Sequence, residues 1–275
     1  MSGTDQLLER IAAALERLAA PAPAAPDWLS HPAYVWHGRT ARSVAHIEAP
    51  PLGLLRGIDA QKQVVAENVT RLAQGRAAHD MLLWGSRGMG KSALLRSAIV
   101  AAQHDGPERV ALVQVAPDAL STLADLFAAL RGVERQFLVY IDDLGFEDGD
   151  SSGPRALRSW LEGGVEARPG NVRIAVTANR RAIVPRHLSE QDDPINPRDA
   201  VDDKLALADR FGLSIGFHNC SQDDYLAIIA GYAGAYELTW DEGEALEWSK
   251  RRGARSGRVA WQFITELAGR AGKMF

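Results

Sequence analysis

The sequence predicts an α/β fold in which helices alternate with the strands of a parallel sheet. Apolar runs with little alternation recur from Gly53 onward, as expected for strands buried on both faces. Helical patterns separate these runs, and only helical patterns remain after residue 220. A glycine-rich segment, Gly85 to Ser92, joins the first of these strands to a helix. Together these observations predict a sheet followed by a smaller helical region.

The periodicities place each element along the chain. Strands are expected at residues 81–84, 110–115, 137–141, 172–177 and 213–217. Helices are expected at residues 64–72, 93–100, 120–130, 154–161, 222–233, 241–252 and 256–269. We therefore expect an N-terminal segment at 1–50, an α/β domain at 51–220 and a helical subdomain at 221–275.

The first 50 residues differ from the rest of the chain. Four apolar residues form one stripe on a short predicted helix: Leu8, Ile11, Leu15 and Leu18. An alanine- and proline-rich linker follows at 19–26. The helix either docks on its own domain or serves as an oligomerisation or partner-binding arm. Three aromatic residues beyond the linker are expected to pack onto the domain surface: Trp28, Tyr34 and Trp36.

Composition and charge indicate a folded protein of one or two domains. Of 275 residues, 46% are hydrophobic and 24% charged, with a net charge of −4. This charge gives no global reason to expect nucleic-acid binding, although it does not exclude a local basic patch. A single cysteine, Cys220, excludes an intrachain disulfide and favours a reducing compartment. No apolar run approaches the ~20 residues that span a bilayer, and no secretory signal is visible, so we expect a cytoplasmic location.

The segment Gly85-Ser86-Arg87-Gly88-Met89-Gly90-Lys91-Ser92 fits the phosphate-binding Walker A pattern G-x-x-x-x-G-K-[ST]. Its glycines let backbone N–H groups turn toward a phosphate, and the following helix adds the positive end of its dipole. Lys91 can reach the β- and γ-phosphates, and the Ser92 hydroxyl can ligate Mg²⁺. The sequence therefore predicts a nucleoside triphosphate site that extends to Ala93 at the start of the helix.

The third strand ends in two acids, Asp142 and Asp143, which match the Walker B pattern. The carboxyl ends of strands in such sheets face the ligand crevice. Asp142 is therefore expected to hold Mg²⁺ beside Ser92, and Asp143 to polarise the attacking water as a general base. The alternative is an acidic turn after a core strand, since acidic residues continue to Asp150.

The fourth strand ends in Thr177-Ala178-Asn179. A polar residue at this point lies between the two Walker elements, so Asn179 is expected to orient the water against the γ-phosphate. Alternatively, Asn179 starts a turn, a position that asparagine favours.

The Walker motifs, the strand that ends in asparagine and the helical tail resemble the AAA+ ATPases over about residues 50–270. The resemblance implies a five-stranded sheet in the order 5-1-4-3-2 with a C-terminal helical lid. Four stretches are closer to the bacterial AAA+ group known as domain of unknown function 815, which has no established cellular role. These stretches lie at 82–88, 161–169, 177–181 and 255–263.

The same resemblance implies further site residues. Leu55, Gly57 and Ile58 correspond to the segment that lines the adenine pocket. Arg210 corresponds to an arginine finger that reaches the γ-phosphate of a neighbouring subunit, which implies a homo-oligomer. Arg258 matches the sensor 2 position, which contacts the nucleotide of its own subunit. The alternatives are an interdomain salt bridge for Arg210 and a solvated helix start for Arg258.

Asp143 departs from the Asp-Glu pair that is frequent in AAA+ proteins. Aspartate is one methylene shorter than glutamate, so we expect slow hydrolysis if the water sits less well. The same Asp-Asp pair occurs in proteins that resemble replication initiators and transposition-helper ATPases, so activity is not excluded.

Two charged regions bear on partners. Seven basic side chains against one acid lie at 249–275, which indicates either a nucleic-acid face or a solvated surface. A long acidic loop at 184–204 indicates either a mobile or a functional loop, and its acidity argues against phosphate contact there.

The sequence therefore predicts an ATPase that uses ATP and Mg²⁺ to perform conformational work on a protein or nucleic-acid client. An ATP-dependent, DNA-associated switch or loader with slow or partner-stimulated hydrolysis is the alternative. A nucleotide-bound scaffold without turnover is a third possibility.

Overall fold

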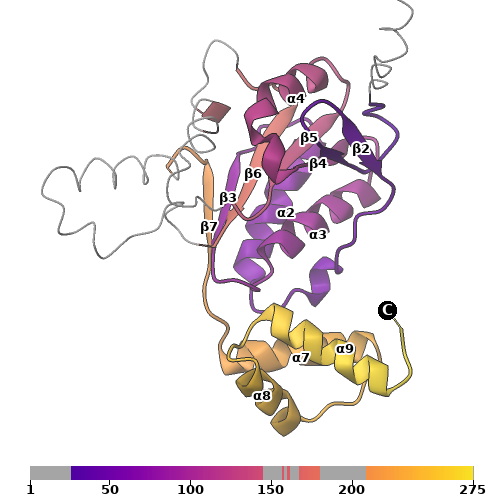
Figure 1. The fold of residues 1–275 in the computed structure, drawn as a ribbon, viewed down its shortest axis with the longest axis vertical. Coiled ribbons are helices and arrows are strands. Elements are labelled where there is room, and N and C mark those ends of the chain that lie inside the picture. Colours follow the sequence, from indigo (N-terminus) through magenta and orange to yellow (C-terminus); the bar gives the residue numbers. More distant parts are fainter. Residues whose placement is uncertain (1–25, 145–156, 158–159, 162–166, 180–208, 275) are drawn as a thin grey trace, which may run out of the picture.

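The computed structural model describes residues 26–144, 157, 160–161, 167–179 and 209–274. These residues form one sheet with helices on both faces and a separate group of three helices beyond one end of the sheet (Figure 1). The predicted N-terminal helix, the acidic loop at 184–204 and most of the predicted helix at 154–161 lie outside the described residues.

The sheet has seven strands in the order β2-β1-β4-β5-β6-β3-β7. All neighbouring pairs are parallel except β1 and β2, which are antiparallel. The strands are β1 (Ala33–Trp36), β2 (Ala41–Val44), β3 (Met81–Gly85), β4 (Val110–Val115), β5 (Gln136–Ile141), β6 (Val172–Ala178) and β7 (Leu213–Phe217).

The prediction of a five-stranded sheet is therefore wrong in strand number and in the full order. Two strands from the N-terminal segment, β1 and β2, extend the sheet beyond β4. The five expected strands follow one another as β4-β5-β6-β3-β7, which is the expected succession with this extension at one edge. Trp28, Tyr34 and Trp36 pack against the domain as expected, and they do so within one of its core clusters, with exposed fractions of 7%, 1% and 3%.

Arg135 holds this extension to the rest of the sheet. Its side chain is 4% exposed, and its Nη1 atom donates to the carbonyl oxygens of Trp28, Leu29 and His31 at 2.8–3.0 Å. Its Nη2 atom donates to carbonyls in the segment that enters β4. A buried guanidinium needs several acceptors to offset its lost hydration. Arg135 therefore fixes the N-terminal segment against β4 through the carbonyls of both.

The helices that flank the sheet bury different halves of its core. Two of them pack with Leu138 and Tyr140 on one face, while the third packs with Phe137 and Val139 on the other (Figure 1). The first two are α2 (Asp59–Ala73) and α3 (Lys91–His104), and the third is α4 (Leu123–Leu130). Successive strand residues point to opposite faces, which is why alternate residues of β5 join different clusters.

The helical region after β7 is confirmed and contains α7 (Gln222–Ala235), α8 (Glu242–Arg251) and α9 (Gly257–Arg270). Each helix begins at a side-chain cap. Ser221 forms a capping box with Asp224, while Asp241 and Ser256 accept backbone N–H bonds from the first turns of α8 and α9. These caps explain why the helical patterns in the sequence start where they do.

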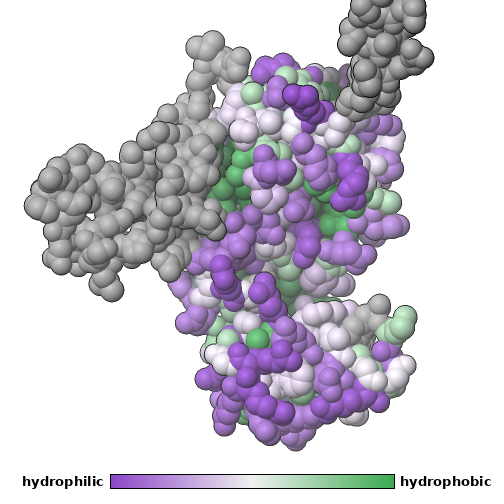
Figure 2. Space-filling model, in the orientation of Figure 1, coloured by the Kyte–Doolittle hydropathy of each residue, from purple (hydrophilic) through white to green (hydrophobic). Residues whose placement is uncertain are grey.

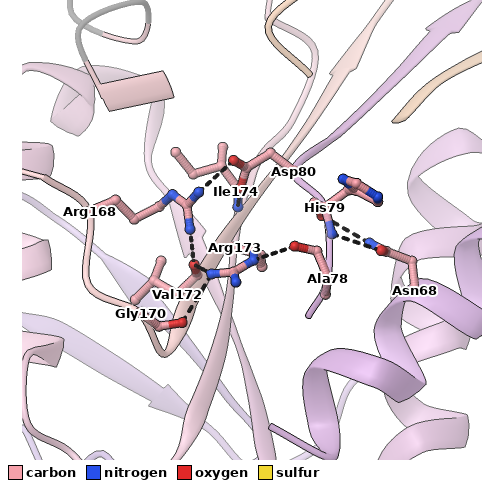
Figure 3. Close-up of polar contacts among 9 residues, drawn as sticks. All are labelled: Asn68, Ala78, His79, Asp80, Arg168, Gly170, Val172, Arg173 and Ile174. Atoms are coloured by element: carbon pink, nitrogen blue, oxygen red, sulfur yellow. Dashed lines mark hydrogen bonds and ion pairs between the residues drawn. The ribbon is translucent and has the colours of Figure 1, made fainter. Parts of the chain in front are cut away.

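A closed polar network occupies the amino ends of the central strands (Figure 3). Asp80 pairs with Arg168 at 2.8 Å and accepts the Ile174 N–H at 2.7 Å. Arg173 donates from Nε to the Ala78 carbonyl at 2.6 Å. Burial, and then the like charge of Arg168, lower the pKa of Arg173. Arg168 Nε is the one atom of these side chains that is buried without a hydrogen-bond partner among the described residues. The carboxyl ends of the strands lie at the opposite edge.

Candidate functional site

The carboxyl ends of three adjacent strands bring the predicted site residues together. β3 pairs Trp84 with Ala178 of β6, and β5 pairs Ile141 with Val176 of β6. The glycine-rich loop, the two acids and Asn179 directly follow these ends, so the parallel register places all of them at one edge of the sheet.

The glycine-rich loop depends on backbone conformations that favour glycine. Gly85, Gly88 and Gly90 have φ angles of +124°, +75° and +86°. A Cβ on Gly85 would lie 2.0 Å from the carbonyl oxygen of Phe217, a contact that no side chain tolerates. The Ser86 N–H donates to this same oxygen at 2.9 Å. The loop can therefore follow this path only because Gly85 has no side chain.

Lys91 is the first residue of α3, and its side chain folds back into the loop. It is 6% exposed, and Nζ donates to the carbonyl oxygens of Gly85 at 2.8 Å and Ser86 at 2.9 Å. Nζ also lies 3.4 Å from Oδ1 of Asn179. Burial lowers the pKa of Lys91. Asp143 and Asp142 oppose this effect, but the net shift is downward. The ammonium group thus lies among carbonyl and carboxylate oxygens at the centre of the site.

The Asp142 carboxylate lies beside Ser92. Ser92 Oγ donates to Asp142 Oδ1 at 2.8 Å, and Thr177 Oγ1 donates to the same oxygen at 2.7 Å. Burial alone raises the pKa of Asp142, but the neighbouring hydroxyls of Tyr140, Thr177 and Ser92 and the charge of Arg96 outweigh this effect. The net result is a lowered pKa, which favours the ionised carboxylate that a divalent cation requires.

Asp143 turns away from the strand in a left-handed backbone conformation, with a φ angle of +48°. Its N–H donates to Thr177 Oγ1 at 2.8 Å, and its carboxylate accepts a short hydrogen bond from Nδ2 of Asn179. Aspartate is one of the few non-glycine residues that adopt this conformation readily. The two residues expected to act on the water are thus in contact with each other.

A cavity of about 910 Å³ lies over these groups. Its wall includes the loop from Arg87 to Ala93, both acids, Asn179, Arg258, Leu55 and Ile58. Three predicted nucleotide-binding residues are not part of the wall: Gly57, Gly85 and Ser86. Sequence reasoning missed several residues that are part of it: Glu48, Arg56, Arg96, Thr177, Tyr232, Tyr236 and Trp261.

Three aromatic side chains bring the C-terminal helices into this cavity. The Tyr232 ring lies 5.0 Å from the Trp261 ring and 6.4 Å from the Tyr236 ring, measured between centroids. They come from α7, the residue that follows it, and α9, so only the packing of these helices brings them together.

The loop also contacts the helical region directly. The Arg258 N–H donates to the Gly88 carbonyl at 3.1 Å, and Ser86 Oγ is hydrogen-bonded to Asn219 Oδ1 at 2.6 Å. Asn219 belongs to the segment between β7 and α7, and Arg258 to the first turn of α9. The side chain of Arg258 is exposed on the cavity wall, at the predicted sensor 2 position.

Arg210 lies at the other end of the sheet from the cavity. It precedes β7, whose first residue Leu213 pairs with Met81, while its last residue Phe217 pairs with Gly85. The Leu213 N–H donates to the Asp80 carbonyl, within the polar network at the amino ends. Strands rise about 3.3 Å per residue, so the length of β7 separates Arg210 from the glycine-rich loop of its own chain.

The basic side chains of the C-terminal region are partly engaged with acids and aromatic rings. Arg251 Nη2 lies 3.6 Å from Glu247 Oε1. Arg270 forms ion pairs with Glu244 and Glu266. The Arg252 guanidinium lies 4.8 Å from the centroid of the Trp248 ring. Figure 2 shows a mostly hydrophilic surface over these helices in that view.

The donor set at Ser92 and Asp142 fits Mg²⁺. A hydroxyl and a carboxylate are hard oxygen ligands, and Mg²⁺ binds through few protein groups while keeping several waters. The buried Tyr140 hydroxyl lies close enough to the Asp142 carboxylate to lower the pKa of Asp142, but its geometry does not form a hydrogen bond with any described residue. An unpaired buried hydroxyl beside such donors is what a site completed by metal-bound water would show.

Several solved structures have folds similar to that of this chain. The RuvB Holliday junction branch migration motor of Thermotoga maritima has a TM-score of 0.51 and 15% identity, covering 80% of this chain and 68% of that one. The ORC1 protein of Aeropyrum pernix in complex with DNA has a TM-score of 0.53 and 16% identity, with coverages of 80% and 65%. The Aeropyrum pernix ORC2 protein in ADPNP–ADP complexes has a TM-score of 0.52 and 16% identity, with coverages of 79% and 64%.

The chain thus spans about two thirds of the RuvB chain and slightly less of the two ORC proteins. The chain shares its fold with these proteins, and a glycine-rich loop joins β3 to α3 within this fold. The chain belongs to the family described as "Protein of unknown function (DUF815)", which it matches over residues 29–271. A comparison with curated proteins finds no match. Among the described residues, no helix has the length and apolar character needed to cross a membrane.

We predict that Gly85→Ala lowers the free energy of unfolding by about 3 kcal/mol or more, because the new Cβ overlaps the Phe217 carbonyl and the backbone is left-handed. Denaturant titration of the purified variant measures this change. Gly53→Ala is the matched control, since a Cβ there meets nothing within 4 Å. Equal stabilities of the two variants would contradict the prediction.

Proposed function

We propose that this chain is an AAA+ ATPase that binds ATP and Mg²⁺ in the cavity and couples binding and hydrolysis to conformational work on a macromolecular partner. One observation carries the proposal. Lys91, Ser92, Asp142, Asp143 and Asn179 converge on one cavity at the carboxyl ends of three adjacent strands. This is the arrangement that phosphoryl transfer to water requires of a P-loop protein.

In the proposed mechanism the glycine-rich loop binds the phosphates through backbone N–H groups at the start of α3. The Lys91 ammonium exchanges the carbonyls of Gly85 and Ser86 for phosphate oxygens. Ser92 and Asp142 would hold Mg²⁺, which neutralises phosphate charge when it is bound. Asp143 accepts a hydrogen bond from the attacking water, and Asn179, which contacts both Lys91 and Asp143, orients that water.

The base is proposed to lie toward Leu55 and Ile58, whose buried apolar side chains line the cavity together with the aromatic residues of the helical region. Arg258 would contact the phosphates from α9. Since Arg258 and Asn219 both contact the glycine-rich loop, a bound nucleotide is expected to change how α7–α9 rest on the sheet. The helical region would then act as the lid that transmits nucleotide state.

Lys91 is the residue whose loss should weaken nucleotide binding most directly. Lys91→Ala is expected to weaken ATP binding by about 30-fold or more, because a buried cation that contacts phosphate is worth about 2 kcal/mol or more. Calorimetric titration with ATP and Mg²⁺ measures the affinity, and phosphate release measures hydrolysis. Lys62→Ala is the control, since Lys62 pairs with Asp59 on α2 away from the cavity wall. Wild-type binding and turnover by Lys91→Ala would overturn the proposal.

Arg210 is proposed to act on the nucleotide of a neighbouring copy of the chain. Its position at the amino end of β7 supports this, because the length of the strand separates it from the loop of its own chain. Head-to-tail assembly brings opposite ends of successive subunits together. The proposed ATPase is therefore a homo-oligomer in which each site is completed by the next subunit.

Mixing subunits tests this assembly. Arg210→Ala and Asp143→Asn proteins are each expected to be inactive alone. An equal mixture creates roughly a quarter of interfaces with both residues intact, so ATP hydrolysis should return to about that fraction of the wild-type rate. A mixture as inactive as its components, in assemblies shown to exchange subunits, would exclude action between subunits.

An ATP-dependent switch or loader on DNA is the second candidate. Arg251, Arg252 and Arg255 are exposed at the end of α8 and in the loop before α9, which favours it. The comparisons add that one similar structure is an ORC1 protein in complex with DNA. The pairing of Arg251 with Glu247 counts against a strongly positive surface.

Salt-dependent binding distinguishes the two candidates. If DNA binds at this surface, replacing the three arginines with alanine should lower the slope of log affinity against log salt by up to about 3. Fluorescence anisotropy with labelled duplex DNA measures the slope. Alanine at Arg42, Arg71 and Arg76, which are exposed on the α/β part, is the matched control. Absence of binding at low salt would rule out the DNA candidate.

A further inference from the structure

The Thr177 hydroxyl connects the two acids that follow β5. Its oxygen accepts the Asp143 N–H at 2.8 Å, and its proton is donated to Asp142 Oδ1 at 2.7 Å. An N–H group can only donate and an ionised carboxylate can only accept, so the direction of both bonds is fixed. Thr177 is 1% exposed and lies on β6, so its hydroxyl has a fixed position in the sheet.

Thr177 also holds the backbone turn at Asp143. The Asp143 N–H reaches the Thr177 hydroxyl, and the next N–H along the chain, that of Leu144, donates to the Thr177 carbonyl at 2.8 Å. Both bonds flank the left-handed conformation of Asp143, with its φ of +48°. Such a conformation persists only where its surroundings determine it. Thr177 therefore fixes the position of the Asp142 carboxylate and the backbone turn from which the Asp143 side chain leaves the strand.

A second hydroxyl lies beneath the same carboxylate. Tyr140 precedes Asp142 by two residues, so both side chains lie on the face of β5 that packs against α3. Its side chain is 2% exposed, and within the described residues its hydroxyl has no hydrogen-bond partner. Buried hydroxyls without partners are rare, and water or an ion is the usual explanation.

We propose that Thr177 is a positioning residue for the metal and the attacking water, and that the Tyr140 hydroxyl completes the outer shell by bonding to a metal-bound water. The proposal rests on the function proposed above and adds two residues to it. Thr177 acts through Asp142 on the metal and through Asp143 on the water. Tyr140 gains a well-formed hydrogen bond when the metal and its waters are bound.

The contribution of Mg²⁺ to nucleotide affinity tests both roles. A non-hydrolysable ATP analogue is titrated calorimetrically with Mg²⁺ and with EDTA, and the ratio of the two affinities gives that contribution. Thr177→Val keeps the shape without the hydroxyl and should reduce the ratio about 10-fold or more, as loss of an outer-shell partner does. Thr177→Ser keeps the hydroxyl and should retain the ratio. Affinity in EDTA should be unchanged in both variants.

Tyr140→Phe separates the metal role from folding. It removes a hydroxyl that has no partner without the metal, so thermal stability without nucleotide should be unchanged or higher. The Mg²⁺ ratio should nevertheless fall about threefold, for one lost hydrogen bond. A lower stability with an unchanged ratio would overturn the role of Tyr140.

The outcomes for Thr177 are equally separable. An unchanged ratio in folded Thr177→Val, or an equal loss of affinity in Mg²⁺ and in EDTA, would overturn its role as a positioning residue. Wild-type protein that binds the analogue equally well with and without Mg²⁺ would also overturn the role of Thr177, because Mg²⁺ would then contribute nothing to affinity. Wild-type protein that binds no analogue in either buffer would instead overturn the proposed function itself.

Discussion

The contact between Gly85 and the Phe217 carbonyl is the constraint on which the rest of the site depends. It brings the ends of β3 and β7 closer than any side chain allows, and the Ser86 N–H then closes the contact with a hydrogen bond. The loop leaves the sheet in a fixed direction as a result, so that α3 begins with Lys91 facing the acids of β5. The same contact places the segment after β7, which includes Asn219, against the loop.

The electrostatics of the site follow from this geometry. A buried ammonium group is costly without acceptors, and Lys91 finds two carbonyls of its own loop and the amide of Asn179. The same loop begins a helix at the cavity, so the positive end of the α3 dipole lies with Lys91 opposite the carboxylates of Asp142 and Asp143. The site is thus built for an anion together with a cation, rather than for either alone.

The sequence was sufficient for the parts of the fold that depend on local pattern. Long apolar runs predicted the five central strands, and the parallel register then brought the Walker residues to one edge. β1 was missed because Ala33–Trp36 is short and its partner β4 is more than 70 residues away, so only the folded chain pairs them. The role of Arg135 in holding that pairing depends on the same long-range contact.

The site shows the same division between local and long-range information. Thr177 and Tyr140 lie two residues before Asn179 and Asp142, so the alternation of side chains along a strand already places them on the site face. The aromatic residues around Trp261 carried no such signal, because α7 and α9 bring them to the cavity through packing alone.

The hairpin of β1 and β2 has a consequence for behaviour in solution. Without it, the six-residue, largely buried strand β4 would form the border of the sheet, with its N–H and C=O groups free to recruit a strand from another molecule. With it, the border is the four-residue β2, whose Arg42 and Ser43 are exposed. A short, charged border strand resists intermolecular strand addition. The hairpin of β1 and β2 is thereby expected to disfavour strand addition at this border of the sheet.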